Sequence, residues 1–205
     1  KYNSNIIYFP TVINTEIYEK FIDNKKYKNF TVVWIGTPST SHYLKKIIPT
    51  LNQLVKDISI KINIIGANKK DVSKLNCDYY EWNIENELFL LSKCHIGIMP
   101  LLDSDWERGK CGFKILQYMA LKLPVIASPV GVNKEIIKDN NNGLFAYSSN
   151  DWYEKIKHLK DNSKTYTKLS NEGYKTVTKY YNLKSYNKFY FKEIEKIYQL
   201  YFNNN

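Results

Sequence analysis

The segment that most constrains the fold is 107–131, with the sequence ERGKCGFKILQYMALKLPVIASPVG. Its first apolar residues recur at the spacing of a helix with one buried face. They are Phe113, Leu116, Met119 and Ala120. Residues 123–127, LPVIA, then form a short apolar run with β-branched members, which is typical of a strand covered on both faces of a parallel sheet. This segment therefore predicts a helix that leads directly into a buried strand.

The remainder of the chain repeats the alternation of strand and helix. We expect further strands at 6–9, 31–35, 60–65, 78–82, 96–99 and 144–147. Helices are expected at 43–58, 85–91, 132–138 and 151–159, with Ser41 and Asn150 as caps, a polar loop at 68–76, and a helical region over 164–202. This order predicts an α/β fold, a doubly wound parallel (Rossmann-like) sheet with ligands at the carboxyl ends of its strands.

The length suits a single domain with a sizeable core. We divide it into a linker region at 1–30, a Rossmann-like core at 31–162 and C-terminal helices at 163–205.

A cationic, glycine-containing turn precedes the helix that begins at Phe113. It carries Arg108, which is the only arginine of the chain, together with Lys110 and Gly112, and Lys114 follows in the first turn of the helix. Unpaired backbone N–H groups and the helix dipole both favour an anion at such a point. The turn therefore predicts a phosphate pocket.

A second phosphate-facing loop is expected after the strand at 31–35. That strand ends at Gly36, and Thr37 opens a hydroxyl-rich loop. A glycine turn between a strand and a helix lets the backbone approach a phosphate or a sugar closely. The alternative is that Gly36 only terminates the strand.

Two sequence motifs carry a resemblance to a known family. QYMALKLPVIASPVG, which starts at Gln117, and KDNNNGLFA, which starts at Lys138, resemble the C-terminal, donor-binding domain of GT-B fold retaining glycosyltransferases of the "group 1" family. The resemblance implies that the chain is one half of a two-lobed enzyme, that it begins near the interdomain linker, and that the N-terminal acceptor domain is missing. It also implies sugar transfer from a UDP-sugar or GDP-sugar to an acceptor with retention and without a metal, and an isolated half that is inactive.

The family places two glutamates around the start of this helix, and here those positions hold Gly109 and Gln117. The second family glutamate holds the ribose, so the resemblance assigns Gln117 to the ribose and predicts that Gln117→Glu keeps or improves nucleotide binding. The first faces the sugar and phosphates, a role for which Glu107 is the nearest candidate. Glu107 and Lys114 are therefore our catalytic candidates.

The resemblance also assigns the donor-binding residues. They are Gly36, Thr37, Trp82, Asn83, Arg108, Lys110, Gly112, Phe113, Lys114 and Gln117, with Trp82 and Asn83 near the base.

Composition excludes several other classes of protein. The net charge is +10, but it comes from scattered lysines rather than an arginine-rich patch, so we expect no nucleic acid partner. A basic face could instead contact an anionic membrane. No apolar run is long enough to cross a bilayer and the start has no signal-peptide pattern, so we expect a cytoplasmic protein, with association at a membrane surface as the alternative. Asp103 and Asp105 are the weaker alternative of a metal pair.

Two other functions remain open at this point. Gly109 and Gln117 at the glutamate positions favour a non-catalytic domain that binds a nucleotide sugar or a partner protein. A regulatory doubly wound domain without nucleotide affinity is the third alternative.

Overall fold

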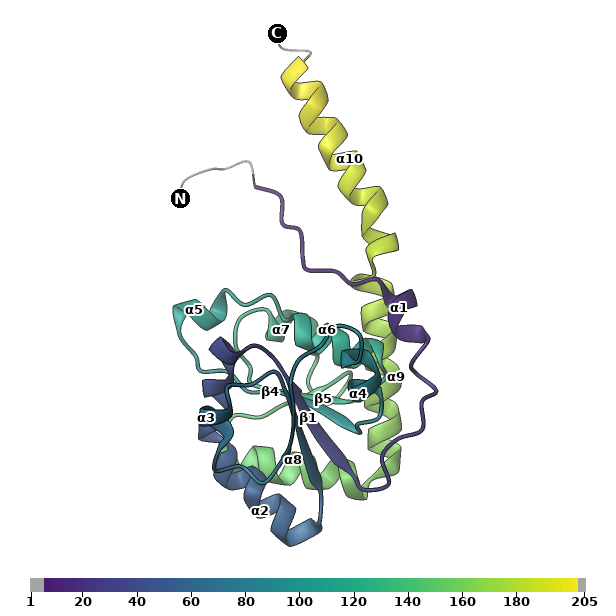
Figure 1. The fold of residues 1–205 in the computed structure, drawn as a ribbon. Coiled ribbons are helices and arrows are strands. Elements are labelled where there is room, and N and C mark those ends of the chain that lie inside the picture. Colours follow the sequence, from purple (N-terminus) through teal and green to yellow (C-terminus); the bar gives the residue numbers. More distant parts are fainter. Residues whose placement is uncertain (1–5, 203–205) are drawn as a thin grey trace.

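A computed structural model describes residues 6–202 as one parallel sheet between two layers of helices (Figure 1). The strands are β1 (Thr31–Ile35), β2 (Lys61–Ile65), β3 (Asp78–Tyr80), β4 (Ile96–Met99), β5 (Val125–Ala127) and β6 (Leu144–Phe145). Their order is β3-β2-β1-β4-β5-β6, and every neighbouring pair is parallel. The predicted doubly wound sheet is confirmed.

Helices connect the strands and cover both faces of the sheet. They are α1 (Thr15–Glu19), the 3-10 helix η1 (Pro38–Lys46), α2 (Ile48–Ile58), α3 (Lys69–Val72), α4 (Glu87–Ser92), α5 (Asp105–Arg108), α6 (Phe113–Ala120), α7 (Asn133–Ile136), α8 (Ser149–Asp161), α9 (Ser163–Tyr180) and α10 (Leu183–Phe202). One apolar core lies under α2 and α8, and a second lies under α4 and α6. Every residue of β1, β4 and β5 is buried, as their apolar, partly β-branched sequences predict.

Three local predictions outside the strands are wrong. Ser41 does not cap a helix, because Pro38 starts a 3-10 helix there, and its hydroxyl instead donates to Asp71 Oδ2 at 2.6 Å. The polar stretch at 68–76 contains the short helix α3, since the Asn68 side chain accepts a hydrogen bond from the Lys70 N–H at 3.0 Å. The cap of α8 is Ser148 rather than Asn150, and its Oγ accepts from the Asp151 N–H at 3.1 Å.

Residues 6–9 do not form the expected strand. No strand edge lies beside them, and Phe9 instead packs its ring on α10, against Phe189 at 5.6 Å and Tyr190 at 5.3 Å between centroids. Figure 1 shows this N-terminal arm and α10 leaving the sheet domain on the same side. They leave it together because Ile13 pairs with the chain between α9 and α10: its N–H donates to Tyr181 O, and its O accepts from Leu183 N, both at 2.9 Å.

Candidate functional site

Two glycines at the carboxyl ends of β1 and β2 lie against each other. Ile35 and Ile65 are the last paired residues of β1 and β2, and Gly36 and Gly66 come directly after them. The Gly36 N–H donates to Ile65 O at 3.0 Å. Gly66 has φ of +75°, and a Cβ there would lie 2.3 Å from the Gly36 oxygen. A Cβ on Gly36 would lie 2.5 Å from the Trp34 indole. Both positions require glycine, so the chain presents bare backbone at this edge of the sheet.

Helix α6 is anchored beside the same strand end. Its N-cap, Gly112, has φ of +71°, which favours glycine. Six residues further on, the buried Tyr118 hydroxyl accepts a hydrogen bond from the Ile35 N–H at 3.1 Å. The ring has room because β4 carries Gly97, where a Cβ would come within 2.3 Å of Tyr118. The first turn of α6 is therefore held next to Gly36.

A cavity of about 400 Å³ lies between these elements. Its lining consists of Ile35, Gly36, Thr37, Pro38, Gly66, Trp82, Glu87, Phe113, Lys114 and Gln117. Six of our predicted site residues are thus brought together: Gly36, Thr37, Trp82, Phe113, Lys114 and Gln117. Phe113, which we expected on the buried face of the helix, is instead 41% exposed, so its ring is available at the cavity.

Lys114 is the cation of this cavity. Its Nζ lies 5.7 Å from the centroid of the buried Trp34 ring. Burial lowers the pKa of Lys114, and the nearby charge of Lys110 lowers it further. An ammonium group that is partly stripped of water gains more from an anionic ligand than a fully solvated one does.

Glu87 is the functional candidate that the sequence did not reveal. It lies in the first turn of α4, and its Oε1 accepts a hydrogen bond from Gln117 Nε2 at 3.2 Å. Its Oε2 accepts one from Trp82 Nε1. The buried Gln117 is therefore engaged with a carboxylate across the cavity, and the cavity has an acid although α6 offers none. The signal in the sequence was only a glutamate near a helix start, because nothing local links α4 to α6.

Glu107, Arg108 and Lys110 do not line this cavity. Glu107 is buried and accepts hydrogen bonds from the Tyr43 hydroxyl at 2.6 Å and from the Ser104 hydroxyl. The bond from Ser104, and after it the bond from Tyr43, lowers the pKa of Glu107. Burial, and after it the bond to Glu107, raises the pKa of Tyr43 to about 12.

The two cations of the turn are engaged elsewhere. Arg108 donates to Asp103 at 2.8 Å and to Asp105 at 3.1 Å, because the predicted loop contains the short helix α5, which brings these acids to the guanidinium. Lys110 Nζ lies over the rings of Tyr43 and Trp106, at 5.7 and 5.5 Å.

Gly112 and Asn83 support the site from outside the cavity. Gly112 caps α6, and the Asn83 side chain accepts from the Glu85 N–H at 2.8 Å, at the entry to α4. Asp103 and Asp105, the alternative metal pair, both form ion pairs with Arg108. Over residues 6–202, no three His, Cys, Asp or Glu side chains cluster in a way that could hold a metal ion.

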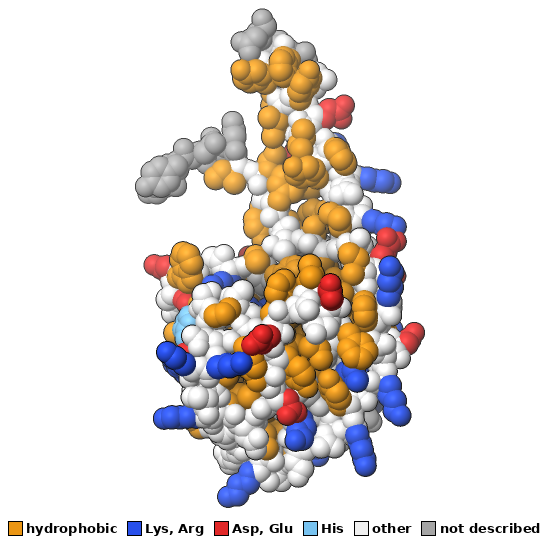
Figure 2. Space-filling model, in the orientation of Figure 1, with side chains coloured by type: hydrophobic (Ala, Val, Ile, Leu, Met, Phe, Trp, Pro, Cys, Tyr) orange, Lys and Arg blue, Asp and Glu red, His pale blue; other side chains and the backbone are white. Residues whose placement is uncertain are grey.

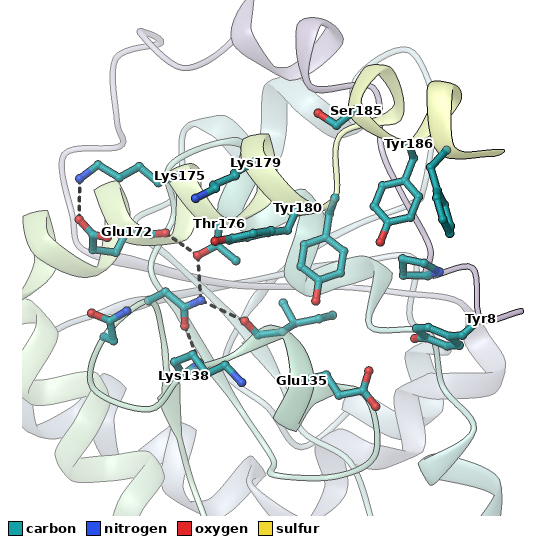
Figure 3. A pocket seen from close by; sticks show the side chains of 16 residues that line it. Tyr8, Glu135, Lys138, Glu172, Lys175, Thr176, Lys179, Tyr180, Ser185 and Tyr186 are labelled. Atoms are coloured by element: carbon teal, nitrogen blue, oxygen red, sulfur yellow. Dashed lines mark hydrogen bonds and ion pairs between the residues drawn. The ribbon is translucent and has the colours of Figure 1, made fainter. Parts of the chain in front are cut away.

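A larger cavity, of about 930 Å³, lies between the N-terminal arm, α7 and the junction of α9 with α10 (Figure 3). Tyr180 and Tyr186 lie along one side of it, and Tyr8, Glu135 and Lys138 lie along the other. None of our predicted site residues lines it, so the smaller cavity at the strand ends is the candidate site.

The fold and the cavity define a Rossmann-like α/β domain with its site at the carboxyl ends of β1 and β2, beside the start of a helix. Comparison with known proteins agrees with this class. The model of the family "Glycosyl transferases group 1" matches residues 29–162, and the chain belongs to that family.

A curated relative and two solved structures extend the match. A probable sucrose-phosphate synthase of Thermosipho melanesiensis is 27% identical over 93% of this chain and 47% of its own length. Anabaena HepE in complex with UDP-glucose superposes with a TM-score of 0.72 at 12% identity, over 90% of this chain and 56% of that one. The C-terminal domain of a group 1 family glycosyl transferase, LpcC, from Francisella tularensis matches with a TM-score of 0.57 at 22% identity, over 86% and 97%. The chain thus spans about half the length of the curated relative and corresponds to a C-terminal GT-B domain.

Proposed function

We propose that the 400 Å³ cavity binds the nucleoside diphosphate part of a sugar donor, and that the full-length protein transfers the sugar to an acceptor with retention of configuration. The observation that carries the proposal is the meeting of Lys114 with the bare backbone at Gly36 and Gly66 in one cavity. Lys114 would neutralise the charge that grows on the diphosphate as the glycosidic bond breaks. A UDP-sugar or a GDP-sugar is the expected donor, and no metal is required; the Anabaena structure is a complex with UDP-glucose.

Calorimetric titration with UDP and GDP tests the binding step. Lys114→Ala is expected to lower the affinity by about tenfold or more, because a charge-assisted hydrogen bond contributes about 1.5–3 kcal/mol. Lys56→Ala is the matched control: Lys56 is exposed on α2, away from the cavity, and its loss should leave the affinity unchanged. Equal affinities in all three proteins would refute the assignment of the diphosphate to Lys114.

A non-catalytic nucleotide-sugar-binding domain is the second candidate. It is favoured by Gly109, which offers no side chain, and by Glu107, whose carboxylate is buried and already bonded to Tyr43 and Ser104. The two candidates differ in the full-length protein. Transfer of sugar from the donor supports the enzyme, and tight nucleotide binding without turnover supports the second candidate.

We further propose that the apolar faces of α10 and of the N-terminal arm pack on the acceptor domain of the full-length protein. No residue of α10 is buried, and Figure 2 shows hydrophobic side chains gathered along it. Phe191, Ile197, Leu200 and Tyr201 are each more than half exposed. A contact with anionic lipid is the alternative, which binding to vesicles of phosphatidylserine and phosphatidylcholine would test on the full-length protein.

A cytoplasmic location belongs to the same proposal. In the part of the chain that the structure describes, none of the helices is both long and apolar enough for a membrane span.

A further inference from the structure

Glu87 reaches the cavity from a different part of the chain than the residues that surround it. It lies on α4, after β3 at the edge of the sheet, whereas Lys114 and Gln117 lie on α6. Its two oxygens are bound by different neighbours, Oε1 by Gln117 Nε2 at 3.2 Å and Oε2 by Trp82 Nε1. The carboxylate is therefore fixed in orientation at the wall of the cavity.

The two donors leave the carboxylate with capacity for a ligand. An ionised carboxyl group offers about four lone-pair sites, and the Gln117 amide and the Trp82 indole occupy one each. Both donors are neutral, so the negative charge remains available to strengthen further hydrogen bonds. A group with one acceptor site free on each of two adjacent oxygens matches two adjacent hydroxyl groups.

The spacing along α6 agrees with a nucleotide. Lys114 and Gln117 are three residues apart on one helix, and side chains at this separation are neighbours on the helix surface. A ligand that places a phosphate at Lys114 therefore has its adjoining sugar close to the Gln117 and Glu87 pair.

We propose that Glu87 is the ribose-binding residue of this chain: its carboxylate accepts hydrogen bonds from the 2′- and 3′-hydroxyls of a ribonucleoside diphosphate, and Gln117 and Trp82 hold it in place. This inference rests on the proposed function and deepens it. The acid that recognises the diol comes from α4, and Gln117 acts by positioning it. The site is thereby specific for ribonucleotides over ligands without the diol.

A purely structural role for Glu87 predicts something different. Glu87 lies in the first turn of α4, where the helix dipole stabilises an acid, and it could serve only to fasten Trp82 and α6 to that helix. Its loss would then weaken every nucleotide equally, because the shape of the whole cavity would change.

The test compares ligands with and without the diol on the intact chain. UDP and 2′,3′-dideoxy-UDP are titrated by calorimetry into the parent protein and into Glu87→Gln, with the two guanosine analogues in parallel. We expect the parent to bind the ribonucleotide about tenfold or more tightly than its dideoxy analogue. In Glu87→Gln the ribonucleotide should fall to the level of the dideoxy analogue, whose own affinity should change by less than about twofold.

Three outcomes would overturn the proposal. Equal affinity of the parent for both ligands excludes a diol contact, and this arm needs no folded variant. An equal loss of both ligands in Glu87→Gln assigns Glu87 a structural role. An unchanged preference in Glu87→Gln moves diol recognition to another residue. The absence of any nucleotide binding by the parent is a separate result, because it refutes the proposed function as well.

Discussion

The contact between Gln117 and Glu87 makes a prediction about folding stability that does not depend on any ligand. Gln117 is 4% exposed, and its Nε2 lies 3.2 Å from Glu87 Oε1. Gln117→Glu would replace a donor with a second carboxylate at this distance. At an effective dielectric of about 20, two unit charges this close repel by about 5 kcal/mol.

Solvent at the half-buried Glu87 reduces this repulsion, so we expect Gln117→Glu to lower the free energy of unfolding by roughly 1–3 kcal/mol at neutral pH. Protonation of one of the two carboxyl groups removes this repulsion. The introduced carboxyl should therefore hold its proton to a higher pH than a free glutamate, whose pKa is about 4.3. A raised pKa in the folded state means that the variant is closest to the parent near pH 4 and loses stability as the pH rises towards 7.

Urea denaturation of the parent and the variant between about pH 4 and 8 measures this difference. Gln117→Leu is the control, because it removes the same hydrogen bond without adding charge. The double variant Gln117→Glu with Glu87→Gln again places an amide beside an acid. It should recover a large part of the free energy of unfolding that Gln117→Glu alone loses. A loss for Gln117→Glu that equals that of Gln117→Leu at every pH, without recovery in the double variant, would refute the reasoning. From the sequence alone we expected this substitution to preserve nucleotide binding; the position of Glu87 now predicts weaker binding.

Three further predictions follow from buried groups. Tyr118→Phe should lower the free energy of unfolding by about 1–3 kcal/mol in urea, because it leaves the Ile35 N–H buried without its acceptor. Burial lowers the pKa of Lys26 to about 8 from 10.5. Between about pH 8 and 10 the folded state has released this proton and the unfolded state still holds it, so the stability of the parent should rise with pH relative to Lys26→Met. If a diphosphate binds at Lys114, whose pKa burial lowers, binding at alkaline pH should take up a proton, which calorimetry in buffers of different ionisation enthalpy detects.

Each of these predictions has a matched control. Tyr180→Phe alters an exposed tyrosine and should change stability by less than about 0.5 kcal/mol. Lys25→Met, which alters an exposed lysine next to Lys26, is the control for Lys26→Met. For the proton uptake, the variant Lys114→Ala should bind without it. The first prediction is contradicted if Tyr118→Phe loses as little stability as Tyr180→Phe. The second is contradicted if stability changes with pH in parallel in the two lysine variants. The third is contradicted if proton uptake is equal with and without Lys114.

The sequence predicted the parts of this molecule that depend on local patterns. Gly36 ends a β-branched strand and Lys114 begins an amphipathic helix, and the doubly wound topology then brings both to one edge of the sheet. Gly36, Thr37, Phe113 and Lys114 share one cavity, whereas Arg108 and Lys110, predicted from the same kind of pattern, lie outside it.

The remaining features depend on contacts between distant segments, which no local pattern reveals. Glu87 meets Gln117 only because α4 and α6 pack on the same apolar core. Arg108 was expected at the phosphate but is held by Asp103 and Asp105, since α5 turns the segment on itself. Residues 6–9 have the composition of a strand but no neighbour to pair with, so tertiary packing decided their conformation.

The pairing of Ile13 with the chain at Tyr181 and Leu183 has a mechanical consequence. Two hydrogen bonds that share Ile13 hold the arm to the start of α10, and an ion pair between Lys184 and Glu16 holds α10 to α1. A body packed on both segments would therefore be carried by the arm and α10 together. The ring contacts of Phe9 with Phe189 and Tyr190 add a second link between the same two segments, so the arm and α10 would move as one unit.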